Sequence, residues 1–111
     1  MFMVKVRKFY NYPAHAVRVF ERVMREQAAL GHSLQSLTKG SFIGTGVSLR
    51  FEFAESPETT DYRLAYFYGR RRDESDVAFR GWRFASVLPM KCQWITIGYF
   101  YVLKRDHETV A

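Results

Sequence analysis

The segment Trp94-Ile95-Thr96-Ile97-Gly98-Tyr99-Phe100-Tyr101-Val102-Leu103 is rich in β-branched and aromatic side chains, which favour strands. Both of its alternating sets are largely apolar, as is typical of a central strand that is buried on two faces. Two other aromatic runs lie at residues 49–53 and 62–68, and the first of them alternates apolar with polar side chains. That alternation indicates a strand with one covered face. Together the three runs predict an antiparallel sheet with broad aromatic surfaces.

A long amphipathic helix is predicted over residues 14–30. Its apolar side chains recur at intervals of three and four, and charged side chains cover the opposite face. The apolar stripe comprises Ala16, Val17, Phe20, Val23, Met24, Ala28 and Leu30. Asn11 is a cap-type residue, Pro13 suits the first helical turn, and Gly31 is well placed to end the helix. These signals place a single long helix between the first two strands.

The remaining strands are expected at residues 2–9, 33–38, 47–54 and 82–88, with a short helix over residues 73–80. Gly40, Gly44 and Gly46 indicate turns or a bulge, and Pro89 separates the last two strands. The economical topology is a meander. We therefore expect one α+β domain over residues 1–111: an antiparallel sheet with one long and one short helix, approximately ferredoxin-like. A helix-strand-strand plan is used twice, with a period of about fifty residues.

The composition indicates a basic, soluble domain. The chain has 111 residues, and 17 Lys and Arg against 11 Asp and Glu give a net charge of +6, which favours anionic partners. Cys92 is the only cysteine, so no internal disulfide can form, and a cytoplasmic location is the simplest inference. The start of the chain lacks the pattern of a secretion signal. The longest uncharged stretch, residues 92–103, is shorter than the roughly 20 residues of a membrane-spanning helix.

No catalytic set is evident in the sequence. His15, His32, His107 and Cys92 lack the paired spacings of zinc sites, and no serine-hydrolase motif is present. The glycines near residue 40 are not followed by the Gly-Lys-Ser/Thr of a phosphate-binding loop. The acidic side chains Glu52, Glu55, Glu58 and Asp61 lead through a polar connection. Its sequence shows no sign of the burial that would raise the pKa of a carboxyl group. We expect no enzyme activity, no metal and no cofactor.

Several motifs together resemble an uncharacterised bacterial domain family that is often encoded beside PadR-type transcription regulators. They are Phe9-Tyr10-Asn11-Tyr12, a helix running into Gly31, Phe51-Glu52-Phe53, Glu55-Ser56-Pro57, Tyr62-Arg63, Tyr66-Phe67, Gly81-Trp82 and an aromatic strand closing in basic residues, Tyr99 to Arg105. The chain departs from the family at Leu30-Gly31-His32, where Gly-Trp or Gly-Tyr is usual. The resemblance implies a regulatory or interaction role and no assigned reaction.

The function that this sequence favours is non-enzymatic binding of a macromolecule. A protein partner with an acidic surface is placed ahead of nucleic acid, and self-association through an edge strand stays open. The expected partner-binding residues are Arg70, Arg71, Arg72, Tyr66, Tyr68 and Tyr99. Alternatively, these arginines only solvate a loop and pair with Asp73, Glu74 and Asp76. The nucleic-acid alternative requires exposed rings on the sheet, whereas most of these aromatics are expected in the core.

Overall fold

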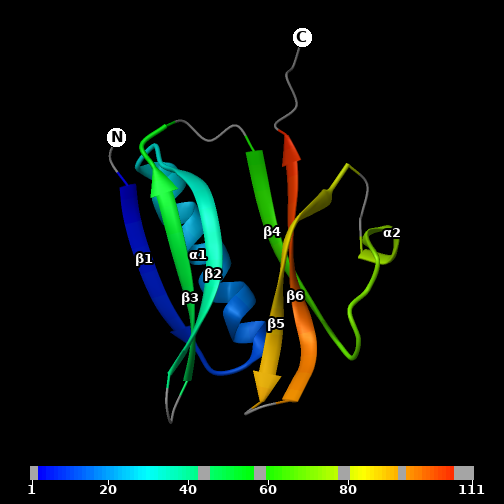
Figure 1. The fold of residues 1–111 in the computed structure, drawn as a ribbon. Helices are drawn as coiled ribbons and strands as arrows, with labels where there is room; N and C mark the ends of the chain where they lie inside the picture. The colour runs from blue at the N-terminus through cyan, green and yellow to red at the C-terminus, as the bar shows by residue number, and fades with distance from the viewer. Residues whose placement is uncertain (1–2, 43–45, 57–59, 78–80, 93–94, 107–111) are drawn as a thin grey trace. The chain divides into compact units, whose positions relative to one another are not determined.

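The computed structural model describes residues 3–42, 46–56, 60–77, 81–92 and 95–106. It divides into two compact units, Met1–Thr59 and Thr60–Ala111, here named unit 1 and unit 2. Figure 1 shows that each unit contains its own sheet and its own helix. The organisation as a single domain stays a prediction, and the two units are described separately. Among the described helices, none is long and apolar enough to cross a membrane.

Both units follow a strand-helix-strand-strand order. Unit 1 consists of β1 (Met3–Tyr10), α1 (Pro13–Ala29), β2 (Ser33–Phe42) and β3 (Gly46–Ala54). Unit 2 consists of β4 (Thr60–Tyr68), α2 (Glu74–Val77), β5 (Arg83–Cys92) and β6 (Ile95–Asp106). The sheets have the orders β1-β3-β2 and β4-β6-β5, and all neighbouring strands are antiparallel. The protein is therefore α+β, with two three-stranded antiparallel sheets and two helices.

The expected single sheet in meander order is wrong. Each unit has its own sheet, and its first strand pairs with the third rather than the second. The physical reason lies in the connections. A helix between two strands returns the chain to the end where it started, so β1 and β2 run parallel and cannot form a hairpin. The hairpin partner of β2 is β3, which fills the place between them.

The pairing registers of the two units match around one bulge, and unit 2 has a second register shift between Met90 and Lys91. In unit 1, Leu34 pairs with Phe53 and Ser36 with Glu52, which leaves one residue bulged. In unit 2, Phe84 pairs with Leu103 and Ser86 with Val102, each fifty positions further along the chain. The repeat indicated by the sequence thus appears as one βαββ plan with a bulge at the same place.

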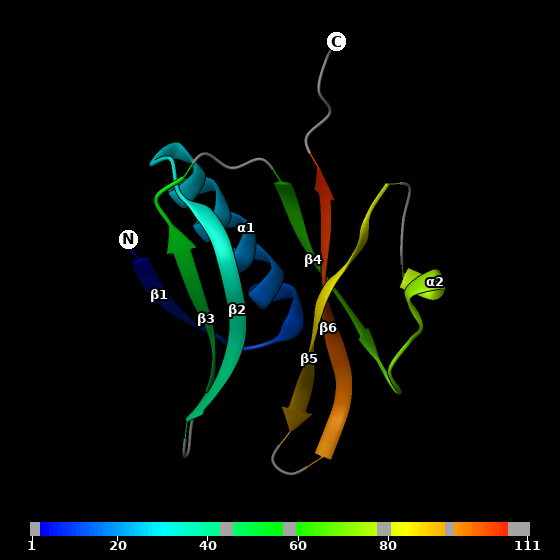
Figure 2. The ribbon, with the colours of Figure 1, turned by 45° about the horizontal axis from the view of Figure 1, so that its top comes forward.

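In unit 1, α1 covers one face of the sheet (Figure 2). Its buried residues are Ala16, Phe20 and Val23, and the Phe20 ring packs against that of Phe51, with 6.0 Å between the centroids. The N-cap of the helix is Tyr12 rather than the expected Asn11, and Pro13 opens the first turn. Gly31 follows the helix with a φ of 78°, the left-handed conformation that glycine adopts without strain.

The strand β6 is the central strand of unit 2, as its sequence predicts. Tyr101 and Leu103 are buried on one face, and Phe100 and Val102 on the other. At Gly98 a side chain would collide with the carbonyl oxygen of Phe67, so glycine allows β4 to approach closely.

Two local expectations need correction. Pro89 does not end a strand but lies within β5, opposite Tyr99, because β5 is an edge strand where a residue without an amide proton is tolerated. The bulge of unit 1 lies between Leu34 and Ser36 rather than among the glycines, and Gly40 pairs regularly with Ser48. Gly44, Trp94 and residues 78–80 of the expected short helix lie outside the described residues.

Candidate functional site

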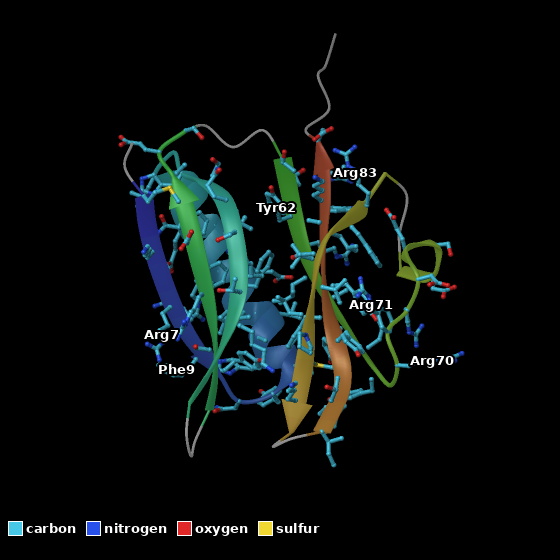
Figure 3. The ribbon with its side chains drawn as sticks, in the orientation of Figure 1. Arg7, Phe9, Tyr62, Arg70, Arg71 and Arg83 are labelled. Carbon is cyan, nitrogen blue, oxygen red and sulfur yellow. The ribbon has the colours of Figure 1, made fainter. Side chains whose placement is uncertain are left out.

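The candidate site lies where the chain leaves β4 in unit 2. Gly69, which follows the strand, has a φ of 94° and donates its backbone N–H to the carbonyl oxygen of Ile97 over 2.8 Å. This left-handed residue turns the chain away from the sheet, and Arg70, Arg71 and Arg72 follow at once. Figure 3 shows Arg70 and Arg71 on this connection between β4 and α2. Local backbone geometry therefore places the arginine run at the sheet margin.

Arg72 anchors the connection to the sheet. Its backbone N–H donates to the hydroxyl oxygen of Tyr101 over 2.7 Å, and its guanidinium lies 4.2 Å from the centre of the Phe67 ring. Tyr101 is fully buried, so this hydrogen bond also satisfies a hydroxyl group that has left water. Further along, Glu74 accepts a hydrogen bond from the backbone N–H of Phe84 over 3.3 Å. The segment is thus fixed at both ends.

Arg70 and Arg71 remain exposed between these anchors. Within the part of the chain that the structure describes, neither they nor Arg72 form an ion pair with Asp73, Glu74 or Asp76. The alternative in which the run is neutralised by its acidic neighbours is therefore not found among these residues. A guanidinium with no carboxylate partner among the described residues keeps its fork of donors for an external anion.

A pocket of about 640 Å³ lies at this connection. Its lining comprises Tyr68, Arg70, Arg71, Arg72, Asp73 and Asp76. The surface of the pocket is mostly polar, and the guanidinium groups outnumber the carboxylates. Such a lining can bind and orient an anionic group by charge-assisted hydrogen bonds, with the two aspartates limiting how much negative charge is accepted.

The structure brings only part of the expected site together. Tyr68 lines the pocket with the three arginines and is 59% exposed. Tyr66 is half-buried and packs against the rings of Tyr68 and Phe100, at centroid distances of 6.0 Å and 6.3 Å. Tyr99 is half-buried on the opposite face of the sheet, beside Tyr101. Neither Tyr66 nor Tyr99 contributes to the pocket lining.

The sequence did not single out Asp73 and Asp76 as pocket residues or Ile95 and Ile97 as exposed apolar ones. The Asp side chains could have been found from their spacing, because positions 73 and 76 lie on one side of a helical turn. The exposure of Ile95, at 68%, could not, because its strand reads as buried throughout. The core assignment of Phe51, Phe53 and Tyr101 is confirmed, since each is at most 1% exposed.

Several other titratable side chains considered in the sequence have local partners. Nδ1 of His15 accepts the backbone N–H of Asn11 over 3.1 Å, and His32 contacts the Gln27 side chain at 2.6 Å. Asp61 forms an ion pair with Arg105 at 3.5 Å, and Glu52 accepts a hydrogen bond from Ser36. Glu58 and His107 lie outside the described residues. In the described part of the chain no group of His, Cys, Asp and Glu is arranged to hold a metal ion.

Burial changes one pKa away from the site. Tyr10, at the end of β1 and 7% exposed, has its pKa raised from 10.0 to about 12, because burial disfavours the phenolate. This tyrosine lies in unit 1, whereas the pocket belongs to unit 2. The shift is therefore a property of the fold of unit 1.

Comparison with known proteins gives no relative to draw on. The chain matches no family model, no curated protein and no solved structure. A function is therefore inferred from the geometry of the described residues.

Proposed function

We propose that the protein is a non-enzymatic binding module that recognises the acidic surface of a protein partner through unit 2. The observation that carries the proposal is the exposed pair Arg70 and Arg71, held on a segment that Arg72 and Glu74 fix to the sheet. A fixed segment loses less conformational entropy on binding than a mobile one. The net charge of +6 attracts an acidic partner over a longer range.

Tyr68 supports a protein partner rather than a nucleic acid at this site. Arginine and tyrosine supply much of the binding energy of protein interfaces, and Tyr68 lies in the same pocket as the arginines. Stacking of successive bases needs several exposed rings. Phe51, Phe53 and Tyr101 are buried instead. The guanidinium groups of the arginines and the phenol hydroxyl of Tyr68 can donate hydrogen bonds to an anion. We include in this proposal that the protein has no catalytic residues, no metal and no cofactor.

Nucleic acid is the second candidate, and a different surface favours it. In unit 1, Phe9 is 52% exposed and the guanidinium of Arg7 lies 5.3 Å from its ring centre (Figure 3). Arg7 is opposite Arg50 in the sheet, and Lys5 lies on the same face two residues earlier. This basic face with one exposed ring could contact a single strand through phosphates and one base.

The remaining expectations belong to the same proposal. A regulatory role and cytoplasmic location agree with the family resemblance and the single cysteine. The approximately ferredoxin-like description is supported by the split β-α-β arrangement in each unit, in which the first two strands flank the third. Self-association stays open as an alternative to a different partner.

The test is affinity capture with the tagged full chain and with the double variant Arg70→Ala/Arg71→Ala. Arg72 is left unchanged because it supports the fold. The matched control is Lys5→Ala/Arg7→Ala, which removes the same charge from unit 1. We expect the wild-type chain and the control to retain one stoichiometric protein that the Arg70/Arg71 variant loses.

A different outcome would sink this proposal. If the Arg70/Arg71 variant retains every partner of the wild-type chain, the site is wrongly assigned. If labelled RNA or DNA binds in a salt-sensitive manner and only the Lys5/Arg7 variant loses it, the nucleic-acid candidate replaces the protein partner.

A further inference from the structure

The pocket at the connection between β4 and α2 offers more hydrogen-bond donors than one carboxylate needs. Arg70 and Arg71 are exposed and line the pocket (Figure 3), and neither pairs with a carboxylate among the described residues. Each guanidinium presents a planar fork of N–H donors, and a carboxylate accepts one such fork in the bidentate arrangement. Two neighbouring forks therefore suit an anion that carries more than two oxygens on one centre.

The third arginine and the tyrosine of the pocket are held by aromatic contacts. The guanidinium of Arg72 lies 4.2 Å from the centre of the Phe67 ring, and its backbone N–H donates to the hydroxyl oxygen of Tyr101. The Tyr68 ring packs against that of Tyr66 in a T-shaped arrangement, with 6.0 Å between the centroids, while Tyr68 itself is 59% exposed. Part of the lining is thus ordered before a ligand arrives, which lowers the entropy that binding costs.

The pocket is also larger than a bare carboxylate requires. Its volume of about 640 Å³ falls within the range of about 300–1,000 Å³ that is usual for sites that bind small molecules. A phosphorylated side chain carries three strong acceptor oxygens and a charge of about −1.5 to −2 near pH 7. Clusters of arginine are a recurrent means of binding this group. Volume and donors therefore fit a phosphorylated side chain better than the side chain of Asp or Glu.

Asp73 and Asp76 line the same pocket and oppose the binding of an anion. The backbone N–H of Asp76 donates to the carbonyl oxygen of Asp73 over 3.0 Å, within the first turn of α2. Acidic side chains suit a first helical turn, because its N–H groups carry partial positive charge. Among the described residues, neither aspartate forms an ion pair with an arginine of the pocket. The two carboxylates thus weaken anion binding without occupying the donors of Arg70 and Arg71.

We propose that this pocket binds the phosphate group of a phosphorylated serine, threonine or tyrosine of the acidic protein partner. Arg70 and Arg71 donate to the phosphate oxygens, and Tyr68 contacts the side chain that carries the phosphate. This inference rests on the proposed function and deepens it, because binding to the partner then depends on the partner's phosphorylation.

The test uses small probes that differ in their anionic group. They are the N-acetyl amides of phosphoserine, phosphotyrosine and glutamate, together with inorganic phosphate as a free anion and dimethyl phosphate as a phosphodiester. Binding to the full chain is followed by NMR through the side-chain Nε–Hε signals of arginine. We expect a phosphorylated amino-acid probe to bind at least about tenfold more tightly than the glutamate probe, and more tightly than either phosphate ion. The signals of Arg70 and Arg71 should shift most.

Two variants separate the fork of donors from positive charge alone. Arg70→Ala/Arg71→Ala should weaken binding of the phosphorylated probes at least about tenfold. Arg70→Lys/Arg71→Lys should weaken it by about threefold or more, because an ammonium group keeps the charge and loses the planar fork. The matched control is Lys5→Ala/Arg7→Ala, which removes the same charge from unit 1 and should bind like wild type.

A third variant tests the opposing carboxylates. Asp73→Asn/Asp76→Asn removes two negative charges from the pocket and keeps side chains that suit the start of a helix. It should bind the phosphorylated probes more tightly than wild type, since like charges repel. Weaker binding would overturn the inference, because the pocket would then prefer a group that donates hydrogen bonds to these carboxylates.

Other results would replace the phosphorylated side chain by a different ligand. If the glutamate probe binds as tightly as the phosphorylated probes, or if the lysine variant binds like wild type, charge alone is recognised and the phosphate inference is overturned. If inorganic phosphate or dimethyl phosphate binds most tightly, a free anion or a phosphodiester of lipid or nucleic acid occupies the pocket instead.

Affinity capture after phosphatase treatment of the lysate separates this inference from the proposed function. We expect the treatment to abolish capture of the stoichiometric partner by the wild-type chain. A partner that the wild-type chain still retains after the treatment, and that the Arg70→Ala/Arg71→Ala variant loses, would overturn the phosphate inference while the acidic-partner proposal stands.

Discussion

Units 1 and 2 share a strand order, a register and a bulge, yet their sheets are covered by different means. In unit 1 a 17-residue helix packs apolar side chains on the sheet. In unit 2 the helix has four residues, and Tyr101 and Leu103 pack instead against Phe67, Trp82 and Phe84, with the Arg72 guanidinium over the Phe67 ring. The comparison teaches that strand pairing does not require a long helical cover.

The opposite faces of the two sheets differ as well. In unit 1 this face carries the exposed cations Lys5, Arg7 and Arg50. In unit 2 the corresponding strand positions carry Leu64, Tyr66 and Phe100, of which Leu64 and Phe100 are buried. The same backbone plan therefore supports a polar face in unit 1 and an apolar face in unit 2. Only the side chains at alternate positions decide between them.

The largest expected effect is a difference in stability between a variant in the helix-covered core of unit 1 and a variant in β6 of unit 2. Phe20→Ala removes a fully buried ring from the contact between α1 and Phe51, and should lower the free energy of unfolding by about 3–5 kcal/mol. Ile97→Ala, near the start of β6, should cost less than about 1 kcal/mol because its side chain is already partly in water. Urea denaturation measures both. Similar losses for the two variants would mean that the face of unit 2 is covered as fully as that of unit 1.

The next effect is specific to unit 1 and depends on pH. Because burial raises the pKa of Tyr10 to about 12, the unfolded chain releases this proton near pH 10 while the folded chain keeps it. Tyr10 therefore adds stability below pH 10 that is lost as the pH rises to 12, on the order of 2 kcal/mol. The measurement is urea denaturation at pH 9 and pH 11.5 on the wild type and Tyr10→Phe. An equal loss in both proteins would contradict the assignment to Tyr10.

The smallest effect separates structural from binding arginines in unit 2. Arg72→Ala removes the guanidinium from the Phe67 ring and should cost about 1 kcal/mol of stability. Arg70→Ala makes no such contact and should change stability by less than about 0.5 kcal/mol, while weakening partner binding. Thermal denaturation of the two variants makes this comparison. Equal stability of the two variants would show that the contact between the Arg72 guanidinium and the Phe67 ring does not stabilise the connection.

The elements of the fold followed from local sequence signals, but their arrangement did not. Alternation along β3 and the three-to-four spacing along α1 set the period of each element, and the doubly apolar β6 indicated a central strand. The choice between a meander and the order β1-β3-β2 depends on which edge each helix crosses, which no local pattern records. The split into two sheets was missed for the same reason, because each strand has the same pattern in one sheet or in two.

Only those features of the site that depend on neighbouring residues in the sequence were predicted. The arginine run was visible in the sequence because three adjacent cations stand out beside a strand end. The different roles of the three arginines could not be predicted, because they depend on Phe67 and Tyr101, which strand pairing brings beneath Arg72. The exposure of Ile95 and Ile97 was hidden because both alternating sets of side chains in β6 are largely apolar, so the sequence does not indicate where burial ends.

The most direct test of this account measures which methyl groups meet solvent. The full chain would be labelled at the methyls of isoleucine and leucine, and NMR spectra recorded with increasing amounts of a soluble paramagnetic agent. We predict strong broadening of Ile95 and Ile97 in unit 2, and protection of Leu34 and Leu49 on the helix-covered face of unit 1. If Ile95 and Ile97 are protected as well as Leu49, the start of β6 is covered as fully as the helix-covered face of unit 1, and the contrast between the two units is wrong.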